Sequence, residues 1–367
     1  MLASLVHKLC VAFRCFGGLG LLASAGCGEA ASELPACPDS GKAVPERLCE
    51  WGFFRDTPGQ LPADGVVPYT VVSNLFTDDA DKLRFIALPD GQKMTYDPLD
   101  IWGFPEGSAV IKTFAYPHDA RDLSQGYQLV ETRLLVFESG IWVPHVYRWN
   151  DAQTEATRFV PGTRVEVAWV DETGTAQTQP YRIPSTDDCK ICHGGKESPT
   201  VLGLRTRQLD TLIADGAGGM SNQLDHFAAL GLLDKTPEPS TMRTRLVDPF
   251  GQADVALRAR AYLDGNCAHC HRQGGDAQSS GLWLNFENED PEHYGVCKIP
   301  VAVGNGGGGL DFDIVPGDPD ASILIFRMEH TAADIKMPEL GGLAPDVAGT
   351  ELMREWIAAM EPKGCGR

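Results

Sequence analysis

The sequence predicts a multidomain β plus α protein, in which an N-terminal antiparallel β sandwich-like domain is followed by mainly α-helical modules. Two observations support this fold class. Short runs of β-branched and aromatic residues, separated by Gly, Pro and Asp, recur between Cys37 and Pro184. After Pro184 the composition changes toward helix and loop. We therefore expect a β-rich domain at 37–184, a first helical segment at 185–235 and a second helical module at 251–362.

The first 26 residues resemble an export signal. Lys8 and Arg14 give a sparse basic start, and the stretch from Val11 to Ala25 is apolar and rich in Gly. The segment ends in LLASAGC, which resembles a lipobox with Cys27 as the lipidated residue; an ordinary cleaved signal peptide is the alternative. A retained membrane anchor is disfavoured because the apolar run is short. We expect residues 1–26 to be removed and the chain to lie in the periplasm or on the outer membrane.

The β-rich region shows the alternation of strands that bury one face. Polar and apolar residues alternate from Arg164 to Trp169, and further β-rich runs occur at LRFIAL, VIKTFAY, LVETRLLVF and VPHVYRWN. Short strands at such intervals are typical of an antiparallel sandwich or barrel-like domain. No metal-ligand cluster or nucleophile arrangement is visible in this region. His118 and His145 stand alone, and we interpret each as a surface or structural histidine.

The pattern Cys-x-x-Cys-His occurs twice after the β-rich region. The copies are CKICH, with Cys189, Cys192 and His193, and CAHCH, with Cys267, Cys270 and His271. This is the attachment signature of c-type haem: two thiols add to the vinyl groups of one porphyrin, and the histidine becomes the proximal iron ligand. A zinc site would need a second ligand pair at a compatible spacing, and a thioredoxin-like pair would need a βαβ context. The sequence therefore predicts two covalently bound haem c groups, with His193 and His271 as iron ligands.

Amphipathic runs surround both motifs. In the first segment SNQLDHFAALGLL places apolar residues on one face, and a linker, DKTPEPSTMRTRLVDP, follows. In the second module DVALRARAYLDGN leads into CAHCH, ASILIFRME follows, and TELMREWIAAM ends the module with a face formed by Leu352, Met353, Trp356, Ile357 and Met360. We expect the first and last of these helices to close a haem pocket. The run VGNGGGGLDF lacks the Lys and Ser/Thr of a phosphate loop and is interpreted as a loop at the haem edge.

The sixth iron ligand separates a carrier from a catalyst. For the second haem we predict Met337, which lies in IKMPEL between the motif and the last helix, with Met328 as the runner-up. Ligation by His and Met would raise the reduction potential. For the first haem Met220, His226 and Met242 are candidates, with Met220 slightly favoured; a ligand from another module, or an open iron, is the alternative.

The remaining cysteines and the charge agree with an exported protein. Of 11 cysteines, those outside the signal, the lipid site and the two motifs are Cys37, Cys49, Cys297 and Cys365. An even number in an oxidising compartment indicates two disulfides, although buried free thiols are an alternative. Four thiols allow three pairings, and we favour Cys37 with Cys49 and Cys297 with Cys365 because each pair lies within one module.

The net charge excludes one class of partner. The formal charge of −19 becomes −21 once Lys8 and Arg14 leave with the signal, so binding to nucleic acid is disfavoured. An acidic surface suits a basic redox partner, and it also serves simply to keep a protein soluble.

Several segments together resemble a bacterial family of dihaem c-type cytochromes that is mostly catalogued as conserved hypothetical proteins. They are LFTDDADKLRFIALPDG, WGFPEGSAVIKTFAY, ETRLLVF and VYRWNDAQTEA, then CKICHG with NQLDH, and NCAHCH with PGDPDASILIFRM, KMPELG and EWI. The block from residue 251 onward is also similar to C-terminal cytochrome c-like domains. The resemblance implies the first motif on one haem, and the second motif with Met337 on the other. It implies no substrate.

These observations lead to three functional hypotheses. The first is an extracytoplasmic dihaem cytochrome that transfers electrons between a donor and an acceptor protein, with membrane association only through a lipid on Cys27. The alternative is a dihaem oxidoreductase of the peroxidase type, in which one haem keeps an open or labile distal site. A third is a binding protein whose β-rich domain recognises a partner or a glycan, while the haem groups are ancillary. The absence of another visible catalytic constellation favours a carrier over an enzyme.

Overall fold

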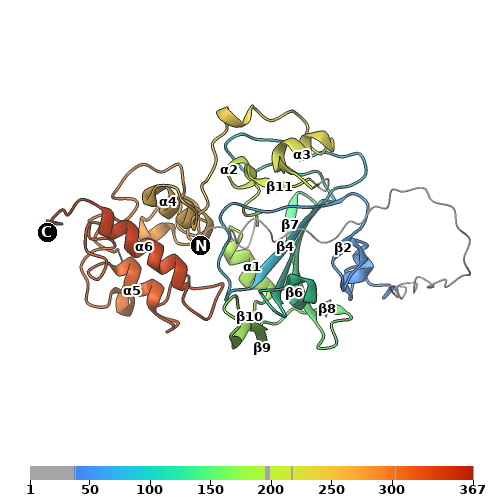
Figure 1. Ribbon diagram of the computed structural model, residues 1–367, viewed down its shortest axis with the longest axis horizontal. Helices are drawn as coiled ribbons and strands as arrows, with labels where there is room; N and C mark the ends of the chain where they lie inside the picture. Colours follow the sequence, from blue (N-terminus) through green and yellow to red (C-terminus); the bar gives the residue numbers. More distant parts are fainter. Residues whose placement is uncertain (1–36, 38, 195–198, 216–217, 302, 367) are drawn as a thin grey trace, which may run out of the picture.

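The computed structural model describes residues 37, 39–194, 199–215, 218–301 and 303–366 (Figure 1). The predicted signal at 1–26 and the predicted lipid site Cys27 lie outside these residues. Within the described part, no helix is both long enough and apolar enough to cross a bilayer.

The centre of the fold is a six-stranded antiparallel sheet. Its strands, in spatial order, are β3 (Val66–Pro68), β4 (Asp81–Ala87), β5 (Ala109–Pro117), β6 (Tyr127–Glu138), β7 (Ile141–Trp149) and β8 (Ala156–Arg158). β6 and β7 form a hairpin whose two-residue turn is Ser139–Gly140. Both turn residues have positive φ, at 53° and 78°, as a turn that follows the right-handed strand twist requires.

The two faces of the sheet are covered by different parts of the chain. One face packs against the N-terminal elements η1 (Leu48–Trp51) and β1 (Phe54–Asp56), and Trp51 Nε1 donates to the Tyr147 hydroxyl at 2.7 Å. The short strand β2 (Leu61–Pro62) pairs with β1. The opposite face carries two apolar regions. One contains Phe114, Val146 and Tyr181 and is covered by the hairpin β9 (Thr163–Val170) and β10 (Ala176–Ile183) and by α1 (Thr186–Cys192).

The second apolar region of that face includes Ile86, Val110, Leu135 and Trp142. It packs against the segment that contains α2 (Thr206–Leu209), β11 (Leu212–Ala214), β12 (Met220–Asn222) and α3 (Gln223–Ala229). Two short 3-10 turns lie in the connections: η2 (Leu123–Gln125) between β5 and β6, and η3 (Ser240–Met242) after α3.

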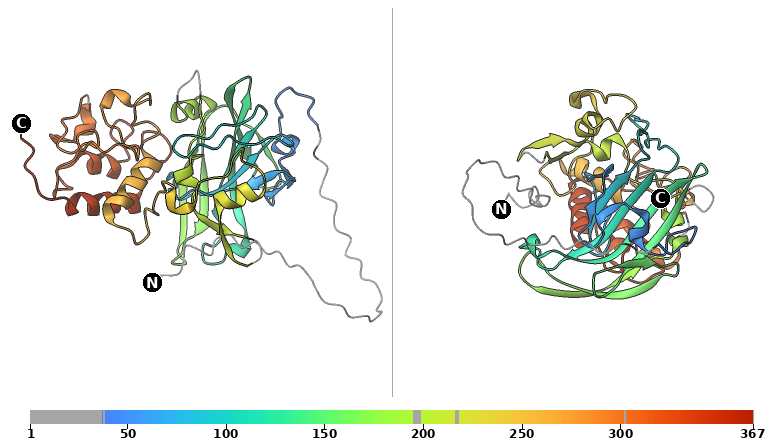
Figure 2. Two further views of the ribbon diagram at one scale, coloured as in Figure 1. Left: turned by 90° about the horizontal axis from the view of Figure 1, so that it is seen from above. Right: turned by 90° about the vertical axis from the view of Figure 1, so that its right-hand side faces the viewer.

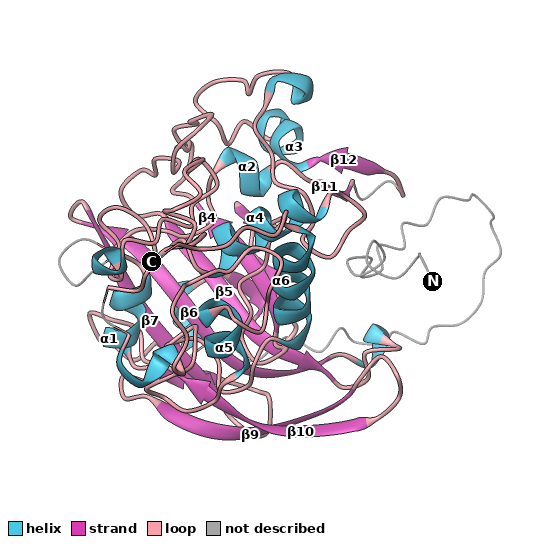
Figure 3. Ribbon diagram, turned by 90° about the vertical axis from the view of Figure 1, so that its left-hand side faces the viewer, coloured by secondary structure: helices cyan, strands magenta, loops and turns pink. Residues whose placement is uncertain are grey.

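The C-terminal part lies beside the sheet, as Figures 1 and 2 show from two directions. It consists of α4 (Val255–Asn266), η4 (Gln278–Ser280), η5 (Gly304–Gly307), α5 (Ile323–Glu329) and α6 (Val347–Ala359). The three helices share one core, in which Leu263, Ile325 and Ile357 are almost fully buried. Seen from the C-terminal side, these helices stand in front of the sheet (Figure 3).

The expectation of mainly α-helical modules after residue 184 is wrong. Strand makes up 26% of the structure and helix only 21%. The segment 185–235 contains a β-hairpin and helices of no more than seven residues, and in 251–362 the three helices have 12, 7 and 13 residues. The physical reason is local: Gly, Pro, Asn and Asp dominate the stretches between the amphipathic runs, and these residues favour turns over helix.

The predicted disulfide pairing is confirmed. Cys37 bonds to Cys49 and Cys297 to Cys365, with Cα–Cα distances of 5.8 and 5.1 Å. The four motif cysteines are not disulfide-bonded.

Candidate cofactor site

The first motif is held by a short helix that directly follows the β9–β10 hairpin. Ser185 caps α1: its hydroxyl accepts from Asp188 N at 3.2 Å, and the Asp188 carboxylate accepts from Ser185 N at 3.0 Å. The helix ends at Cys192, and His193 is its C-cap. Cys189 is buried in the apolar region that contains Phe114 and Tyr181, so the helix is fixed against the sheet through the first cysteine of the motif.

His193 has a defined tautomer. Its Nδ1 lies 2.7 Å from the carbonyl oxygen of Thr200, and Thr200 N donates back to the carbonyl of His193 at 2.6 Å. A carbonyl only accepts, so Nδ1 carries the proton and the lone pair is on Nε2. Burial lowers the pKa of His193 to about 3, which keeps the ring neutral at neutral pH.

The histidine of the second motif, His271, has the same tautomer as His193, but a side-chain hydroxyl fixes it. The chain leaves α4 at Asn266, and CAHCH forms the turns that follow. His271 Nδ1 lies 3.1 Å from the Ser280 hydroxyl, which donates its own proton to the carbonyl of Ala277 at 2.7 Å. The hydroxyl therefore accepts from Nδ1, and Nε2 again carries the lone pair. Burial also lowers the pKa of His271, to about 4.

The two motifs meet, although the contacting residues Cys192 and Cys270 are 78 positions apart in the sequence. The Cys192 thiol is hydrogen-bonded to the Cys270 thiol and to the side chain of His269, the central residue of CAHCH. The bond with Cys270 is the main reason why the pKa of Cys192 falls to about 5, and the pKa of Cys270 rises in turn. Burial raises the pKa of Cys189 to about 11 and that of Cys267 to about 12. The second cysteine of each motif thus faces the other motif.

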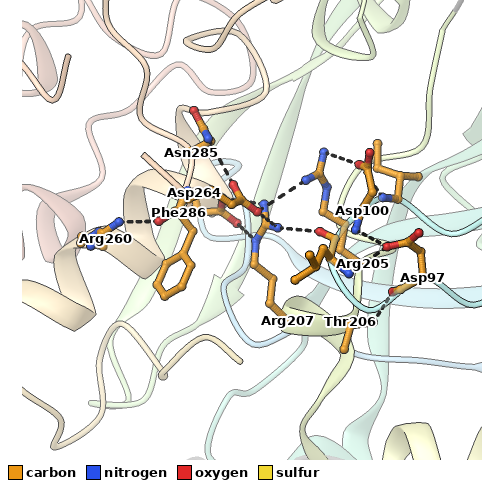
Figure 4. Close-up of polar contacts among 12 residues, drawn as sticks. Asp97, Asp100, Arg205, Thr206, Arg207, Arg260, Asp264, Asn285 and Phe286 are labelled. Carbon is orange, nitrogen blue, oxygen red and sulfur yellow. Dashed lines mark hydrogen bonds and ion pairs between the residues drawn. The ribbon is translucent and has the colours of Figure 1, made fainter. Parts of the chain in front are cut away.

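Asn266 and Gly265 anchor the second motif to the sheet side. The Asn266 amide accepts from Phe76 N at 2.7 Å and donates to the carbonyl of Asn74 at 3.1 Å. A Cβ at Gly265 would overlap Ser73, so glycine permits this close approach. A buried ion pair between Arg207 and Asp264 adds a second link (Figure 4).

A row of cations lies on the sheet beneath the motifs. Arg84 in β4 is the cross-strand neighbour of Lys112 in β5, which is the neighbour of Arg133 in β6. Arg133 is bonded to the fully buried Glu131, which also accepts from the Tyr181 hydroxyl at 2.6 Å. Burial, with the charges of Arg84 and Arg133, lowers the pKa of Lys112 to about 7. The charge of Lys112 also acts on His193, so this row belongs to the surroundings of the first motif.

The predicted sixth ligands lie in different environments. Met337 is half-buried, and its backbone N donates at 2.9 Å to the carbonyl of Arg327, whose guanidinium is one of the charges acting on His271. The runner-up Met328 is 5% exposed in the core of the C-terminal part, where it serves as packing.

The candidates for the first haem are not gathered around CKICH. Met220 and Met242 are exposed by 45% and 74%, and His226 lies on α3, which packs into a different apolar region from Cys189. The two lone histidines of the β-rich region are as interpreted. His118 is exposed, and His145 is buried with its ring 5.5 Å from that of Trp51.

Sequence reasoning missed Lys112 and His269. The signal for Lys112 was a charge inside the apolar run VIKTFAY, and that for His269 was a second histidine inside the motif. In the described residues no group of three or more His, Cys, Asp or Glu side chains is placed to hold a metal ion directly. A haem c site requires no such group, because the porphyrin and axial ligands hold the iron.

No protein-family model, curated protein or solved structure matches this chain. The family resemblance drawn from the sequence therefore stays a prediction, and the geometry of the site carries the functional argument.

Proposed function

We propose that this protein is an extracytoplasmic electron carrier with two covalently attached haem c groups. One observation carries the proposal: in both Cys-x-x-Cys-His motifs the histidine is neutral, with Nδ1 bound to an oxygen acceptor and Nε2 left to bind iron. Histidines that bind metals are held in this way, because the second hydrogen bond fixes the tautomer and the orientation of the ring. Two such motifs in one chain support two haem groups.

Each residue then has a defined task. Cys189 with Cys192, and Cys267 with Cys270, would form the thioether bonds; His193 and His271 would bind the irons, and Met337 would complete the second site. The bound groups would supply one-electron redox chemistry. Because Cys192 contacts Cys270, the two attachment points would lie side by side, and this proximity would favour electron transfer within the molecule. The two disulfides support an oxidising compartment, and the net charge of −19 favours basic partner proteins.

Mass spectrometry of protein produced with a cytochrome c maturation system tests the proposal. We expect the polypeptide mass plus two haem groups. Replacing Cys189 and Cys192 by Ala should remove one haem, and replacing Cys267 and Cys270 should remove the other. Replacing the disulfide pair Cys37 and Cys49 is the control and should leave both in place. A mass equal to the bare polypeptide would exclude the proposal.

One observation favours a peroxidase-like oxidoreductase as a second candidate. Met220 and Met242 lie in exposed positions, and the side chains of Lys112 and His269 lie close enough to His193 to lower its pKa. Such groups serve in acid–base catalysis when peroxide binds to iron. The test is the absorption spectrum of the oxidised protein after cyanide or peroxide is added. A change at one haem would support the enzyme. An unchanged spectrum of two low-spin haems would support the carrier.

A further inference from the structure

A cavity of about 350 Å³ lies between the sheet and the C-terminal part. Arg84 and Lys112 of the sheet line it on one side, Arg205 and Arg207 line it from the segment of α2, and Arg272 lines it just after the second motif. The apolar part of the wall includes Val71, Val201 and Trp283. Against these five cations the lining contains two carboxylates, Asp264 and Glu287.

Both carboxylates are already engaged. Arg207 donates to Asp264 at 3.0 and 3.2 Å and also binds Glu287. Arg205 lies 3.5 Å from Asp100 (Figure 4). It also lies 3.9 Å from Glu287. The charges of the α2 segment are therefore largely compensated within the protein.

The two cations of the sheet are compensated differently. Arg84, which is 7% exposed, donates to the side-chain oxygen of Asn74 at 2.7 Å and to the carbonyl of Lys82 at 3.2 Å, both neutral acceptors. Among the described residues, no Asp or Glu side chain forms an ion pair with Lys112. The two cations are cross-strand neighbours, and like charges in that position repel each other. Buried charge of this kind is stabilised by an anion.

We propose that this cavity binds the carboxylate groups of an anionic ligand through Arg84 and Lys112. Arg84 supplies the planar donor pair that matches a carboxylate, and Lys112 supplies a mobile point charge beside it. Two sources offer this chemistry: the propionate groups of a haem attached at a neighbouring motif, or a small dicarboxylate from solution. The first source rests on the proposed function, and the second does not.

Four variants of the full chain, matured as above, separate the sources: Lys112→Gln, Arg84→Gln, Lys112→Arg and, as a control, Lys93→Gln on an exposed lysine. Two quantities are measured on each: the midpoint potentials of the haems, and the binding of succinate by isothermal titration. Circular dichroism checks that each variant is folded. Lys112→Arg keeps the charge and should behave as the parent chain.

If propionates occupy the cavity, Lys112→Gln and Arg84→Gln should shift the midpoint potential of one haem downward, because lost positive charge favours ferric iron; succinate should have no effect. If a free dicarboxylate is the ligand, the parent chain should bind succinate saturably and the same variants should weaken this binding at least tenfold. Lys93→Gln should change neither quantity. Unchanged potentials together with no succinate binding would overturn the proposal. If no haem is attached, the proposed function fails. The succinate measurement alone then decides whether the cavity binds carboxylate groups.

Discussion

At the residue scale, the two motif histidines show how different neighbours produce one chemical state. His193 uses a backbone carbonyl seven residues away, and His271 uses the hydroxyl of Ser280 nine residues away. A backbone acceptor is insensitive to mutation of its own side chain, whereas a hydroxyl acceptor is removed by a single substitution. The second site is therefore the one at which this hydrogen bond can be tested.

Ser280→Ala should raise the midpoint potential of the second haem. The hydroxyl accepts from His271 Nδ1 and makes the ring a stronger donor to ferric iron. Losing this hydrogen bond should reduce the preference of the site for ferric over ferrous iron by up to about tenfold. This change is equivalent to a rise of about 60 mV in the midpoint potential of a one-electron couple. Ser280→Thr keeps the hydroxyl and should leave the potential unchanged. A potential that is the same in all three proteins would mean that the hydrogen bond has no influence on the iron.

His145 should make the protein less stable as the pH is lowered through a defined window. Burial lowers its pKa from 6.5 to about 4, and its Nε2 has no hydrogen-bond partner among the described residues. Between these values the unfolded chain binds a proton that the folded chain does not, so stability is complete above pH 6.5 and declines as the pH approaches 4. The contribution is at most about 3 kcal/mol.

The comparison of the parent chain with His145→Leu isolates this contribution. The free energy of unfolding is measured with urea at pH 7 and at pH 4. Between these two pH values the parent chain should lose more stability than the variant. A difference that does not depend on pH would show that His145 keeps an ordinary pKa.

At the scale of elements, the crossing of α4 and α6 shapes the C-terminal part. Tyr262 of α4 lies against Gly349 of α6, and its hydroxyl donates to Asp346, the N-cap of α6, at 2.9 Å. A side chain on residue 349 would overlap the buried Tyr262 ring. The glycine thus permits the close packing of the two helices, and the end of α4 places Cys267.

Gly349→Ala should destabilise the protein by about 1–3 kcal/mol. Alanine by itself favours helix by about 1 kcal/mol, but the overlap involves a ring that is held in a packed core. Gly364→Ala, where an added Cβ meets no atom within 4 Å, is the control and should have almost no effect. Urea unfolding of both variants checks the prediction; equal stability would mean that the helices separate without cost.

At the scale of the whole molecule, the sequence revealed what depends on neighbours along the chain. The alternation from Arg164 to Trp169 corresponds to β9, and the amphipathic run before CAHCH corresponds to α4. The disulfide pairs also followed from their places in the sequence. The extent of helix was overestimated, because four amphipathic runs were extended into whole modules although the chain between them is rich in residues that favour turns.

Contacts between distant segments left no such signal. Nothing in CKICH or CAHCH indicates that Cys192 faces Cys270, since this contact depends on how the C-terminal part docks on the sheet. The place of Lys112 between Arg84 and Arg133 depends likewise on the register of three strands. Such features follow from tertiary packing, which periodicity along one segment does not report.

The docking of the C-terminal part should depend on the ion pair between Arg207 and Asp264. Both side chains are 5% exposed, and they join α2, which packs on the sheet side, to α4. Asp264→Ala leaves the buried Arg207 with Glu287, whose side chain is 47% exposed, as its remaining carboxylate partner, so the substitution should cost about 1–3 kcal/mol. Replacing both, as Arg207→Met with Asp264→Leu, should cost much less, because no buried charge remains unpaired.

Calorimetry and urea unfolding of these proteins test the role of the pair. The parent chain should unfold in one transition, and Asp264→Ala should separate it into two, because the C-terminal part then loses a buried polar link to the sheet side while each part keeps its own core. Glu355→Ala, which removes the partner of Arg258 in a pair whose carboxylate is 56% exposed, is the control and should cost less than about 1 kcal/mol. If Asp264→Ala unfolds in one transition with little loss of stability, the two parts are held together mainly by apolar contacts and by the hydrogen bonds of Asn266. The position of the second motif then does not depend on the ion pair.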